Sequence, residues 1–438
     1  MALDKDIYRA FEDIVGEDNI CDDPAVLDCY RYPLTHTAIH LGPYYGVYTP
    51  RGAAVLLPGS TGEVQAIVRA CNRYKLKVKA SSTFWSAQGY PTEEGAIQLD
   101  MRRMDRILEI DEKNMIAVIE PHVIGATLQA EAMKLGLNTH IHGPGASCSL
   151  LASATSLNGM GPDSYYMGNN YDNLVGAEWV MPDGEILRTG TLGSHGDWHY
   201  SEGPGPGTRG IMRGLLGPMG GMGVVTKLAL KLFPWPGPKT LQVTGRPPAY
   251  KANLPKNIRA YTIAFPNWQA YADASFKIWD AGIGYIAHRQ FNFLGRSLKA
   301  AMVRVLTDPT KTLADIPEIK ERPEVKEHTE QAIRDYEFVL AGMTEADIEW
   351  QDAALDDILA EVGGWKVAAM NEPEIQKWLQ VYMIRLGHKN LNLVYGGGYD
   401  GAFGMFGPPD LGIRYIEETA AIKADWEKKA RGASGRTA

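Results

Sequence analysis

The first half of the chain alternates short apolar runs with longer stretches whose apolar residues recur three and four positions apart. Apolar runs bounded by Gly and Pro are typical of buried strands, and the three-and-four spacing is typical of amphipathic helices. By these patterns we expect helices over residues 3–15, 64–74 and 124–135, and strands over residues 53–58, 75–80, 96–99, 107–110 and 115–120. This order of elements indicates a mixed α+β domain.

Capping and turn residues place the ends of these elements. Ser60 is followed three residues later by Glu63, which is the spacing of a capping box at a helix N-terminus. Gly136 is expected to end the helix before it, because glycine takes the left-handed conformation of a C-cap at little cost. A hairpin is expected with its turn at Pro182-Asp183-Gly184 and its strands at residues 177–181 and 185–189.

The pattern changes after the Pro-Trp-Pro-Gly-Pro run at residues 234–238, which is the clearest boundary signal in the chain. Residues 258–280 first alternate and then become helical. Residues 313–362 are charged and predicted to be helical, with most of their charges on a solvated face. A last strand is expected over residues 391–395 and an amphipathic helix over residues 413–429.

Residues 143–180 stand out because small side chains dominate their first half. Residues 143–149 read Gly-Pro-Gly-Ala-Ser-Cys-Ser, without a helical or alternating apolar pattern. Gly, Ala and Ser let a backbone approach another molecule closely, because little side chain stands in the way. The segment therefore indicates main chain wrapped against a ligand, and an ordinary glycine-rich loop is the alternative.

Composition and charge exclude several classes of protein. A length of 438 residues predicts two domains or slightly more, and a formal net charge of −8 without a basic stripe argues against nucleic acid as a partner. No apolar run approaches the roughly 20 residues of a membrane span.

The four cysteines have no CxxC, zinc or iron–sulfur spacing, so reduced thiols are favoured over disulfides. Because the N-terminus opens a helix rather than a signal peptide, we expect a cytoplasmic protein.

Four segments then carry a resemblance to a known family. Residues 81–90 form a polar loop of small residues after a strand–helix–strand unit, where the family has its pyrophosphate loop. Residues 99–107, Leu-Asp-Met-Arg-Arg-Met-Asp-Arg-Ile, are close to its "LDLSRMNRI". Residues 143–180 are similar to its "PGSS…GG…TNAGGP…YG…D", and residues 217–227 to its "GSEGTLGIIT". The chain thus resembles flavoproteins of the vanillyl-alcohol oxidase/p-cresol methylhydroxylase (PCMH) class, with relatives among glycolate oxidase and D-lactate dehydrogenase flavoprotein subunits.

The resemblance implies an α+β fold with a two-subdomain PCMH-type FAD-binding domain and an α+β cap domain that supplies substrate contacts. We expect an N-terminal helix and strap over residues 1–48, the FAD-binding domain over residues 49–238, and the cap domain over residues 239–438. The family ends on a tail like "LNPGK", and no such tail follows Asp400. We therefore expect either a truncated C-terminus or a partner subunit that completes the cap.

FAD is the cofactor that the resemblance implies, extended between the two subdomains. Amides and hydroxyls of the loop would hold the pyrophosphate, and the small residues of the 143–180 segment would present donors and acceptors to the isoalloxazine. The predicted FAD contacts are Ser81, Ser82, Thr83, Phe84, Trp85, Ser86, Gln88, Pro144, Gly145, Ala146, Ser147, Leu151, Ala152, Ser153, Asn158, Gly168, Asp172, Gly223, Val224 and Val225.

The sequence departs from the family pattern at several glycines. Ser82-Thr83-Phe84 replaces the glycine triplet of the pyrophosphate loop, and Phe84-Trp85 stands where the phenol-oxidising branch has Gly-Arg. Ala152-Ser153-Ala154 replaces "GGN", and Met219 replaces the glutamate of "GSEG". The loop also lacks the histidine that some relatives use for covalent attachment, so we expect non-covalent FAD.

The cap domain contains the candidate catalytic residues. The hydroxy-acid branch has a motif "GHxGDGNxH" whose histidines bind a divalent metal, but Gly397 and Gly404 occupy those positions here, so we predict no metal. Hydride transfer to flavin N5 needs a base near the reacting proton, and an arginine would clamp a carboxylate. The candidates are Tyr395, His388, Arg385 and Asp400, each with a structural role as the alternative, and His140 and His142 before the flavin segment.

The function expected from the resemblance is that of an FAD-dependent dehydrogenase. It would take a hydride from a small alcohol, hydroxy acid or activated C–H substrate to flavin N5. The electrons would pass to an iron–sulfur or electron-transfer flavoprotein partner, because the chain lacks relay cysteines, and we expect a homo- or hetero-oligomer. One alternative is a 4-alkylphenol or vanillyl-alcohol-type oxidase, which the many tyrosines favour. Another is a degenerate flavoprotein subunit with a structural role in a complex, which the replaced glycines favour.

Overall fold

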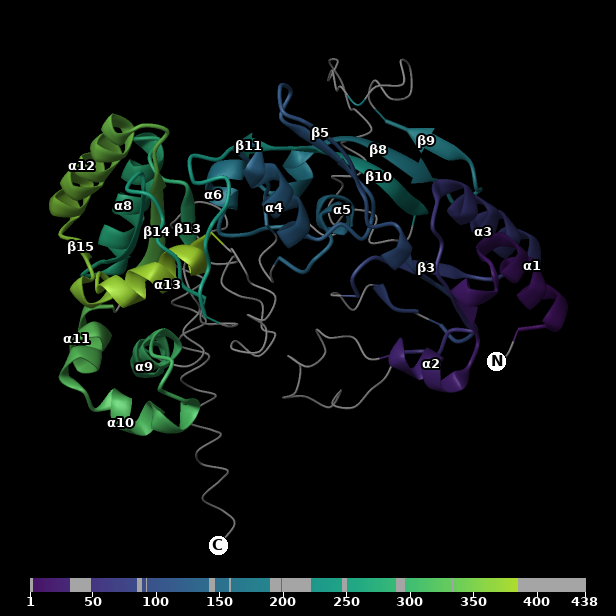
Figure 1. The fold of residues 1–438 in the computed structure, drawn as a ribbon, viewed down its shortest axis with the longest axis horizontal. Helices are drawn as coiled ribbons and strands as arrows, with labels where there is room; N and C mark the ends of the chain where they lie inside the picture. The colour runs from purple at the N-terminus through teal and green to yellow at the C-terminus, as the bar shows by residue number, and fades with distance from the viewer. Residues whose placement is uncertain are drawn as a thin grey trace, which may run out of the picture. The chain divides into compact units, whose positions relative to one another are not determined.

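The computed structural model describes residues 3–31, 49–84, 89–91, 93–141, 146–156, 159–189, 198, 222–245, 250–288, 296–332 and 334–384. The described chain divides into two compact units, one up to Leu241 and one from Gln242 to Ile384 (Figure 1). Within these ranges, no helix is long and apolar enough to cross a membrane. The strand and the helix expected over residues 391–395 and 413–429 lie outside the described residues.

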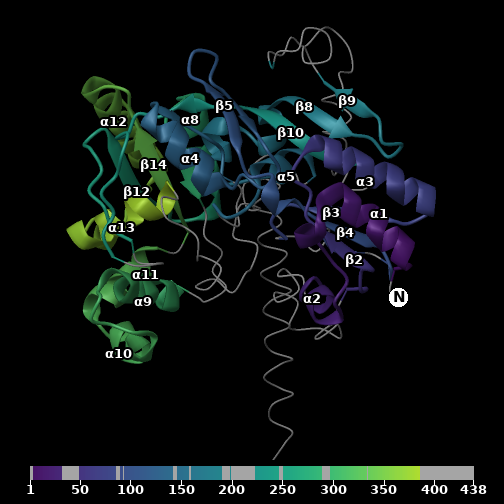
Figure 2. The same cartoon turned by 45° about the vertical axis from the view of Figure 1, so that its right-hand side comes forward.

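The first layer of the first unit is a four-stranded sheet covered by helices. Its elements are α1 (Lys5–Val15), β1 (Ile20–Cys21), α2 (Pro24–Cys29), β2 (Ala54–Leu56), α3 (Thr61–Tyr74), β3 (Val78–Ser81) and β4 (Ile97–Asp100). The strand order is β1-β2-β4-β3, with β1 antiparallel to β2 and the other pairs parallel. Helices α1 and α3 lie side by side (Figure 2), and their apolar faces bury Phe11 and Ile67 in one core.

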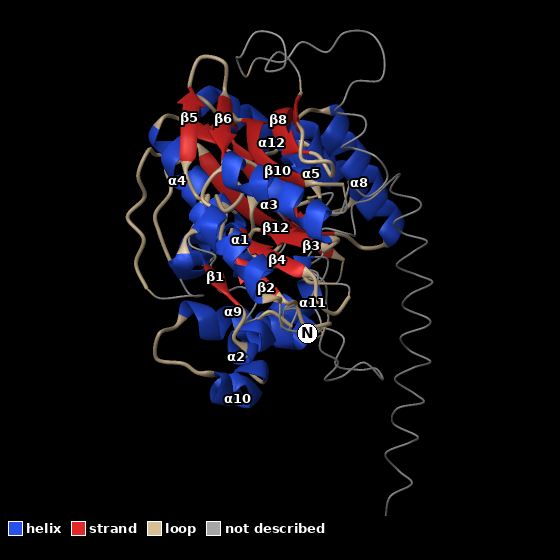
Figure 3. Ribbon diagram, turned by 90° about the vertical axis from the view of Figure 1, so that its right-hand side faces the viewer, coloured by secondary structure: helices blue, strands red, loops and turns tan. Residues whose placement is uncertain are grey.

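The second layer of the first unit is a five-stranded antiparallel sheet. Its elements are β5 (Ile107–Asp111), β6 (Ile116–Ile119), α4 (Gly125–Lys134), β7 (Leu137–Asn138), α5 (Leu150–Thr155), α6 (Ser164–Met167), β8 (Leu174–Val180), β9 (Ile186–Arg188), β10 (Val224–Lys231) and β11 (Phe233–Pro234). The order is β5-β6-β10-β8-β9, and β11 pairs with β7. Figure 3 shows β5, β6, β8 and β10 of this sheet. Apolar side chains of α4, α5 and the sheet, such as Leu128, Leu150 and Trp179, form a second core.

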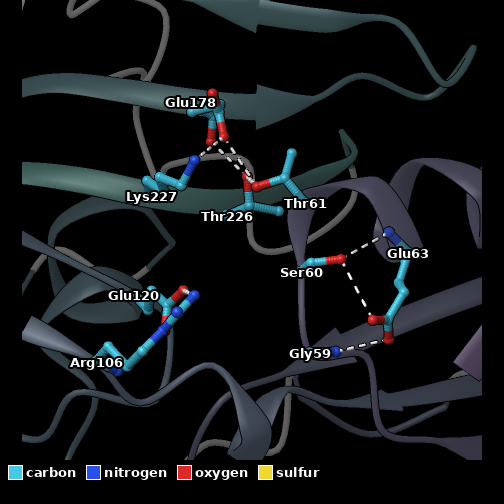
Figure 4. A network of polar contacts seen from close by, with 9 residues as sticks. All are labelled: Gly59, Ser60, Thr61, Glu63, Arg106, Glu120, Glu178, Thr226 and Lys227. Carbon is cyan, nitrogen blue, oxygen red and sulfur yellow. Dashed lines mark hydrogen bonds and ion pairs between the residues drawn. The ribbon is translucent and has the colours of Figure 1, made fainter. Parts of the chain in front are cut away.

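Apolar contacts and a buried carboxylate join the two layers. Val180 and Val224, at adjoining ends of β8 and β10, pack in the core of the first layer rather than the second. Beside them the carboxylate of Glu178, only 5% exposed, accepts hydrogen bonds from Thr61 Oγ1 and Lys227 Nζ, each at 2.8 Å (Figure 4). Since Thr61 opens α3, this buried charge connects the second sheet to the first layer.

The second unit is an antiparallel sheet flanked by helices. Its elements are β12 (Ile258–Ala264), α8 (Trp268–Asp280), β13 (Ile286–His288), α9 (Arg296–Thr307), α10 (Ile316–Lys320), α11 (Pro323–Gln331), β14 (Asp335–Ala341), α12 (Glu345–Val362), β15 (Trp365–Lys366) and α13 (Pro373–Met383). The strand order is β13-β14-β12-β15. Helices α8 and α12 lie side by side (Figure 1), and the Tyr261 hydroxyl on β12 donates to Asp352 on α12 at 3.0 Å.

Most sequence-predicted elements of the first unit are confirmed within a few residues. The capping box is confirmed: Ser60 Oγ accepts from the Glu63 amide at 3.2 Å, and Glu63 Oε2 accepts from the Gly59 amide at 2.8 Å (Figure 4). The hairpin turns at Gly184, whose φ is +85°. All four cysteines are free in the structure.

Two sequence expectations are wrong. Residues 335–341, inside the range predicted to be helical, form the strand β14, because this segment lies between two neighbouring strands and is buried on both faces. A strand buried on both faces loses the alternation by which strands are recognised. Residues 150–155 form the short helix α5, although the small residues in the first half of the 143–180 segment had indicated no helical pattern.

We predict that Glu178 contributes to stability in a pH-dependent way. Burial opposes its charge, but hydrogen bonds from Lys227, Thr61 and Arg188 hold its pKa below the ordinary value. Glu178→Gln should lower the free energy of unfolding at pH 7 by about 2 kcal/mol, because the cations lose their buried partner. A lowered folded-state pKa stabilises above the unfolded pKa of about 4.3, so the difference between the two proteins should shrink as pH falls below about 4.

Urea denaturation of the wild type and Glu178→Gln between pH 7 and pH 3 measures this difference. Glu185→Gln is the matched control, because Glu185 forms an ion pair with Arg69 at 2.8 Å in which both side chains are more than half exposed. The control should change stability by less than about 0.5 kcal/mol. A Glu178→Gln effect that stays constant over the whole pH range would contradict the prediction.

Candidate cofactor-binding site

The first predicted cofactor segment begins where β3 ends. Ser81 closes the strand, and its Oγ accepts a hydrogen bond from the Phe84 amide at 3.2 Å. Gly89 packs against the same hydroxyl, and a Cβ added there would lie 2.5 Å from Ser81 Oγ. Ser81 and Ser82 are both buried. The described part of the loop therefore folds tightly on its own first residue, which needs a glycine at position 89.

Phe84 has a backbone conformation that normally belongs to glycine. Its φ of +52° lies in the left-handed region, which costs a residue with a Cβ about 1–2 kcal/mol. The Tyr90 hydroxyl donates to the Phe84 carbonyl at 3.2 Å. The Phe84 ring also meets Tyr30 and Tyr90 edge-on, with centroid distances of 5.2 and 5.4 Å. These contacts offset the strain at the position where the resembled family has glycine.

The second predicted segment, which begins at Ala146 in the described chain, runs along the N-terminal end of α4. The Ala146 carbonyl accepts from the Ala126 amide at 2.8 Å, and the Cys148 carbonyl accepts from the Gly125 amide at 3.1 Å. A Cβ at Gly125 would lie 3.5 Å from Ala146 Cα and only 2.8 Å from a methyl of Ile141. Small residues here allow backbone to pack on backbone.

Ser149 caps the N-terminus of α5 and bonds it to the turn before α4. Its Oγ accepts from the Ala152 amide at 3.0 Å as an N-cap and donates to the Pro121 carbonyl at 2.6 Å. The N-cap satisfies one of the free amides of the first helical turn. The second bond holds the start of the helix to the turn that precedes α4.

One hydrogen bond joins the two predicted segments, and a second joins the first segment to the turn before α4. The Ser149 amide donates to Thr83 Oγ1 at 3.2 Å. His122 Nδ1 lies 2.5 Å from the Ser82 carbonyl oxygen, and since a carbonyl only accepts, this nitrogen carries the proton. The loop after β3 and the start of α5 are therefore neighbours, although they are more than 60 residues apart in the chain.

Buried polar atoms next to α5 match the chemistry of a polar cofactor. Among the described residues, Ser153 Oγ and Asn173 Nδ2 are buried and have no hydrogen-bond partner. Gly159 approaches Ser153 so closely that a Cβ there would lie 1.8 Å from its Oγ. Native proteins rarely leave such groups unpaired without a ligand or water to satisfy them. A flavin, which carries carbonyl oxygens and ring nitrogens, fits this donor set.

Three apolar members of the predicted set contribute to packing. Leu151 is 4% exposed and lies in the core of the second layer. Val224 is 6% exposed and packs in the core of the first layer, and Val225 packs partly buried against the core of the second. Their side chains hold the layers in place, and any cofactor contact from Leu151 or Val224 would come from the backbone.

Two predicted glycines have left-handed backbones. Gly168 ends α6 with φ +70°, and the exposed Asp172 follows in a short helical turn. Gly223 has φ +98°, and a Cβ there would lie 2.2 Å from the Val180 carbonyl oxygen. A larger residue would be strained by the left-handed backbone at both positions, and at Gly223 it would also collide with the Val180 carbonyl oxygen.

Ten of the predicted site residues lie outside the described residues. They are the cofactor candidates Trp85, Ser86, Gln88, Pro144, Gly145 and Asn158 and the catalytic candidates Tyr395, His388, Arg385 and Asp400. Gly397 and Gly404, on which the prediction of no metal rests, and His142 lie there too. Within the part of the chain that the structure describes, no group of three or more His, Cys, Asp or Glu side chains is arranged to hold a metal.

His140 is part of the framework rather than of an open site. It is completely buried, and its Nε2 lies 2.8 Å from Ser164 Oγ and 3.4 Å from Asp163 Oδ1. Asp163 Oδ2 accepts from the Ile141 amide at 2.6 Å. These bonds hold the start of α6, where burial also raises the pKa of Tyr165 to about 12.

Sequence reasoning missed His122 and Ser149 as site residues. Ser149 had a usable signal, because a serine directly before an apolar run is an N-cap pattern. Nothing in the neighbouring sequence marks His122, and Tyr30, an aromatic residue of the expected N-terminal strap, could not be paired with the cofactor loop. Their roles depend on contacts with residues 40 and 54 positions away.

A known protein family matches part of the first unit. Residues 52–190 match the protein family described as "FAD binding domain", so this part of the chain is an FAD-binding domain. Glycolate oxidase subunit GlcD of Bacillus subtilis (strain 168) is 26% identical over 54% of this chain and 47% of its own length. The probable mitochondrial D-lactate dehydrogenase of Danio rerio is 24% identical over 52% of this chain and 41% of its own. The chain thus spans about half the length of these relatives or less.

Solved structures extend the likeness to most of the chain. p-Cresol methylhydroxylase with bound substrate has a TM-score of 0.60 at 17% identity, covering 86% of this chain and 68% of its own. 4-Ethylphenol oxidase from Gulosibacter chungangensis has the same TM-score at 22% identity, covering 87% and 68%. The fold is therefore the PCMH-type flavoprotein fold, as the sequence segments predicted.

We predict that Ser149 is needed to hold α5 in place. Ser149→Ala removes both the N-cap and the bond to the Pro121 carbonyl, and it should lower the free energy of unfolding by about 1–2 kcal/mol. Ser156→Ala at the other end of α5 is the control, because its hydroxyl meets the neighbouring Thr155 hydroxyl at 3.3 Å rather than a helix amide or another segment of the described chain. Urea denaturation at pH 7 compares the variants, and equal effects of the two substitutions would contradict the prediction.

Proposed function

We propose that this chain is an FAD-dependent oxidoreductase of the dehydrogenase type, acting on a small alcohol, hydroxy acid or activated C–H substrate. The observation that supports the proposal is the hydrogen bond between Ser149 and Thr83, which brings two segments of an FAD-binding domain side by side. When bound, FAD supplies a two-electron acceptor that protein side chains lack. The relatives named glycolate oxidase subunit and D-lactate dehydrogenase support a substrate with a hydroxyl group.

The residues around this junction have separate tasks in the proposed site. Amides and hydroxyls of Ser82 and Thr83 would bind the pyrophosphate, as loops of consecutive N–H groups do for anions. Ala146 and Ala152 would leave room for the ring system, and Ser153 Oγ would donate to it. The predicted base and carboxylate clamp remain Tyr395, His388, Asp400 and Arg385.

The candidate functions differ in the electron acceptor and in whether flavin is bound. The 4-ethylphenol oxidase and p-cresol methylhydroxylase structures share the fold, so a phenol-type oxidase that reduces oxygen directly is the second candidate. A dehydrogenase would instead pass electrons to an iron–sulfur or electron-transfer flavoprotein partner within an oligomer. A degenerate structural subunit would bind no flavin. Cytoplasmic location and non-covalent attachment of FAD complete the proposal.

The visible spectrum of the purified protein tests the proposal first. We expect flavin absorbance, either as isolated or after addition of FAD, and release of that flavin when the protein is denatured with acid. Anaerobic bleaching by 2-hydroxy acids together with slow reoxidation in air would support the dehydrogenase. Bleaching by 4-alkylphenols and rapid reoxidation in air would support the oxidase. Failure to bind FAD under any condition would contradict both.

We predict that bulk at position 152 blocks the cofactor. Ala152 is partly exposed on α5, next to the buried Ser153, so Ala152→Trp should fill the space proposed for the ring system. The dissociation constant for FAD, measured by quenching of flavin fluorescence, should rise at least about tenfold, a loss of about 1.4 kcal/mol. Ala130→Trp, at an exposed position of α4, is the control and should bind FAD like the wild type.

Both tryptophan variants should keep their thermal unfolding midpoints within a few degrees of the wild type, because both sites are on the surface of a helix. Unchanged FAD affinity in Ala152→Trp would place the ring system elsewhere.

A further inference from the structure

We propose that Tyr30 is a positioning residue for the cofactor loop, because its ring supports the left-handed conformation of Phe84 in the described part of the loop. The proposal rests on the proposed binding of FAD by residues 81–84. Tyr30 lies in the N-terminal segment, before the matched range 52–190. A residue from outside the FAD-binding match would then determine whether the loop is ready to bind.

The contacts of Phe84 show why it needs support. Its amide donates to Ser81 Oγ and its carbonyl accepts from the Tyr90 hydroxyl, each at 3.2 Å. Its ring lies between two others: Tyr90 at 5.4 Å with an interplanar angle of 65°, and Tyr30 at 5.2 Å with an angle of 71°. A glycine would take φ +52° without help, whereas Phe84 takes it because its surroundings hold it there.

Tyr30 is itself anchored to the sheet from which the loop departs. Its hydroxyl donates to Asp100 Oδ2 at 2.8 Å, and the same oxygen accepts from Arg102 Nε at 2.7 Å. Asp100 is completely buried and is paired with Ser81 in the ladder of β3 and β4. The anchor of Tyr30 therefore lies level with the first residue of the loop. Burial and the neighbouring Asp100 raise the Tyr30 pKa, so the hydroxyl stays a donor at neutral pH.

The segment that carries Tyr30 is also held in place. The Asp28 carboxylate, two residues before Tyr30, accepts a bidentate pair of hydrogen bonds from Arg51. Arg51 Nε donates to Asp28 Oδ1 at 2.8 Å, and Nη2 donates to Oδ2 at 2.7 Å. Arg31, directly after Tyr30, is held as well, because its Nε donates to the Thr49 carbonyl at 2.8 Å. Tyr30 thus reaches Phe84 from a segment fixed on both sides.

Without Tyr30, Phe84 should leave the left-handed conformation for part of the time. The apparent dissociation constant of a ligand rises by the inverse of the binding-competent fraction. If about one molecule in ten keeps the loop in the conformation that binds FAD, Tyr30→Ala raises the FAD dissociation constant about tenfold. In a Phe84→Gly background the same substitution should change it less than about twofold, because glycine needs no support.

A double-mutant cycle tests this on the full-length protein. FAD is titrated into flavin-free wild type, Tyr30→Ala, Phe84→Gly and the double variant, and flavin fluorescence gives each dissociation constant. Tyr74→Ala is the control, because Tyr74 also makes an edge-on ring contact in the first unit, with Phe11 at 6.5 Å, but no ring contact with the described residues of the loop. Circular dichroism melts confirm that each variant folds, and Tyr30→Leu takes the place of Tyr30→Ala if the alanine variant does not.

The outcomes separate this inference from the proposed function. A tenfold loss that Phe84→Gly removes, with no effect of Tyr74→Ala, supports the positioning role. An equal loss in both backgrounds, no loss in either, or a Phe84→Gly protein that no longer binds FAD overturns it. Failure of the wild type to bind FAD contradicts the proposed function, and the positioning role falls with it.

Discussion

The join between the two layers of the first unit is the constraint on which the candidate site depends. One predicted cofactor segment leaves the first sheet at Ser81, and the other begins α5 on the second. Their relative position is set by Val180 and Val224 and by the buried carboxylate of Glu178. A charge taken out of water is tolerated only with partners in good geometry. The Glu178 cluster therefore restricts how the two layers can pack, and the hydrogen bond between Thr83 and Ser149 joins the same two layers.

Within that frame, the site is built by backbone lying against backbone. Gly125, Gly159 and Gly223 each stand where a Cβ would meet another atom within 3 Å. Such close packing leaves main-chain groups and a few small side chains as the surface for a ligand. The unpaired Ser153 Oγ and Asn173 Nδ2 belong to the same region. Buried polar atoms of this kind are costly unless a ligand satisfies them, which is the physical reason to place a polar cofactor beside α5.

The conformation of Phe84 changes how the replaced glycines of the pyrophosphate loop should be interpreted. A glycine replaced by a large residue first indicated a degenerate loop. In the structure the residue keeps a glycine-like φ of +52°. Two tyrosine rings contact its ring, and the hydroxyls of Ser81 and Tyr90 bond its backbone. The course of the backbone is thus retained while the source of its stability has changed. Glycine supports such a turn by its own freedom, whereas Phe84 depends on neighbours from other parts of the chain.

The sequence by itself determined the local elements of the first unit, the capping box at Ser60, the hairpin at Gly184 and the FAD-binding class, because these depend on periodicity, turn residues and ordered motifs. It could not reveal β14, whose two buried faces carry no alternation, or α5, whose small residues read as loop. Only the tertiary structure decided which polar residues meet: Thr83 with Ser149, His122 with Ser82, and Tyr30 with Phe84. These pairs join segments that are 40 to 66 residues apart, and such contacts are set by how the layers pack and leave no local pattern in the chain.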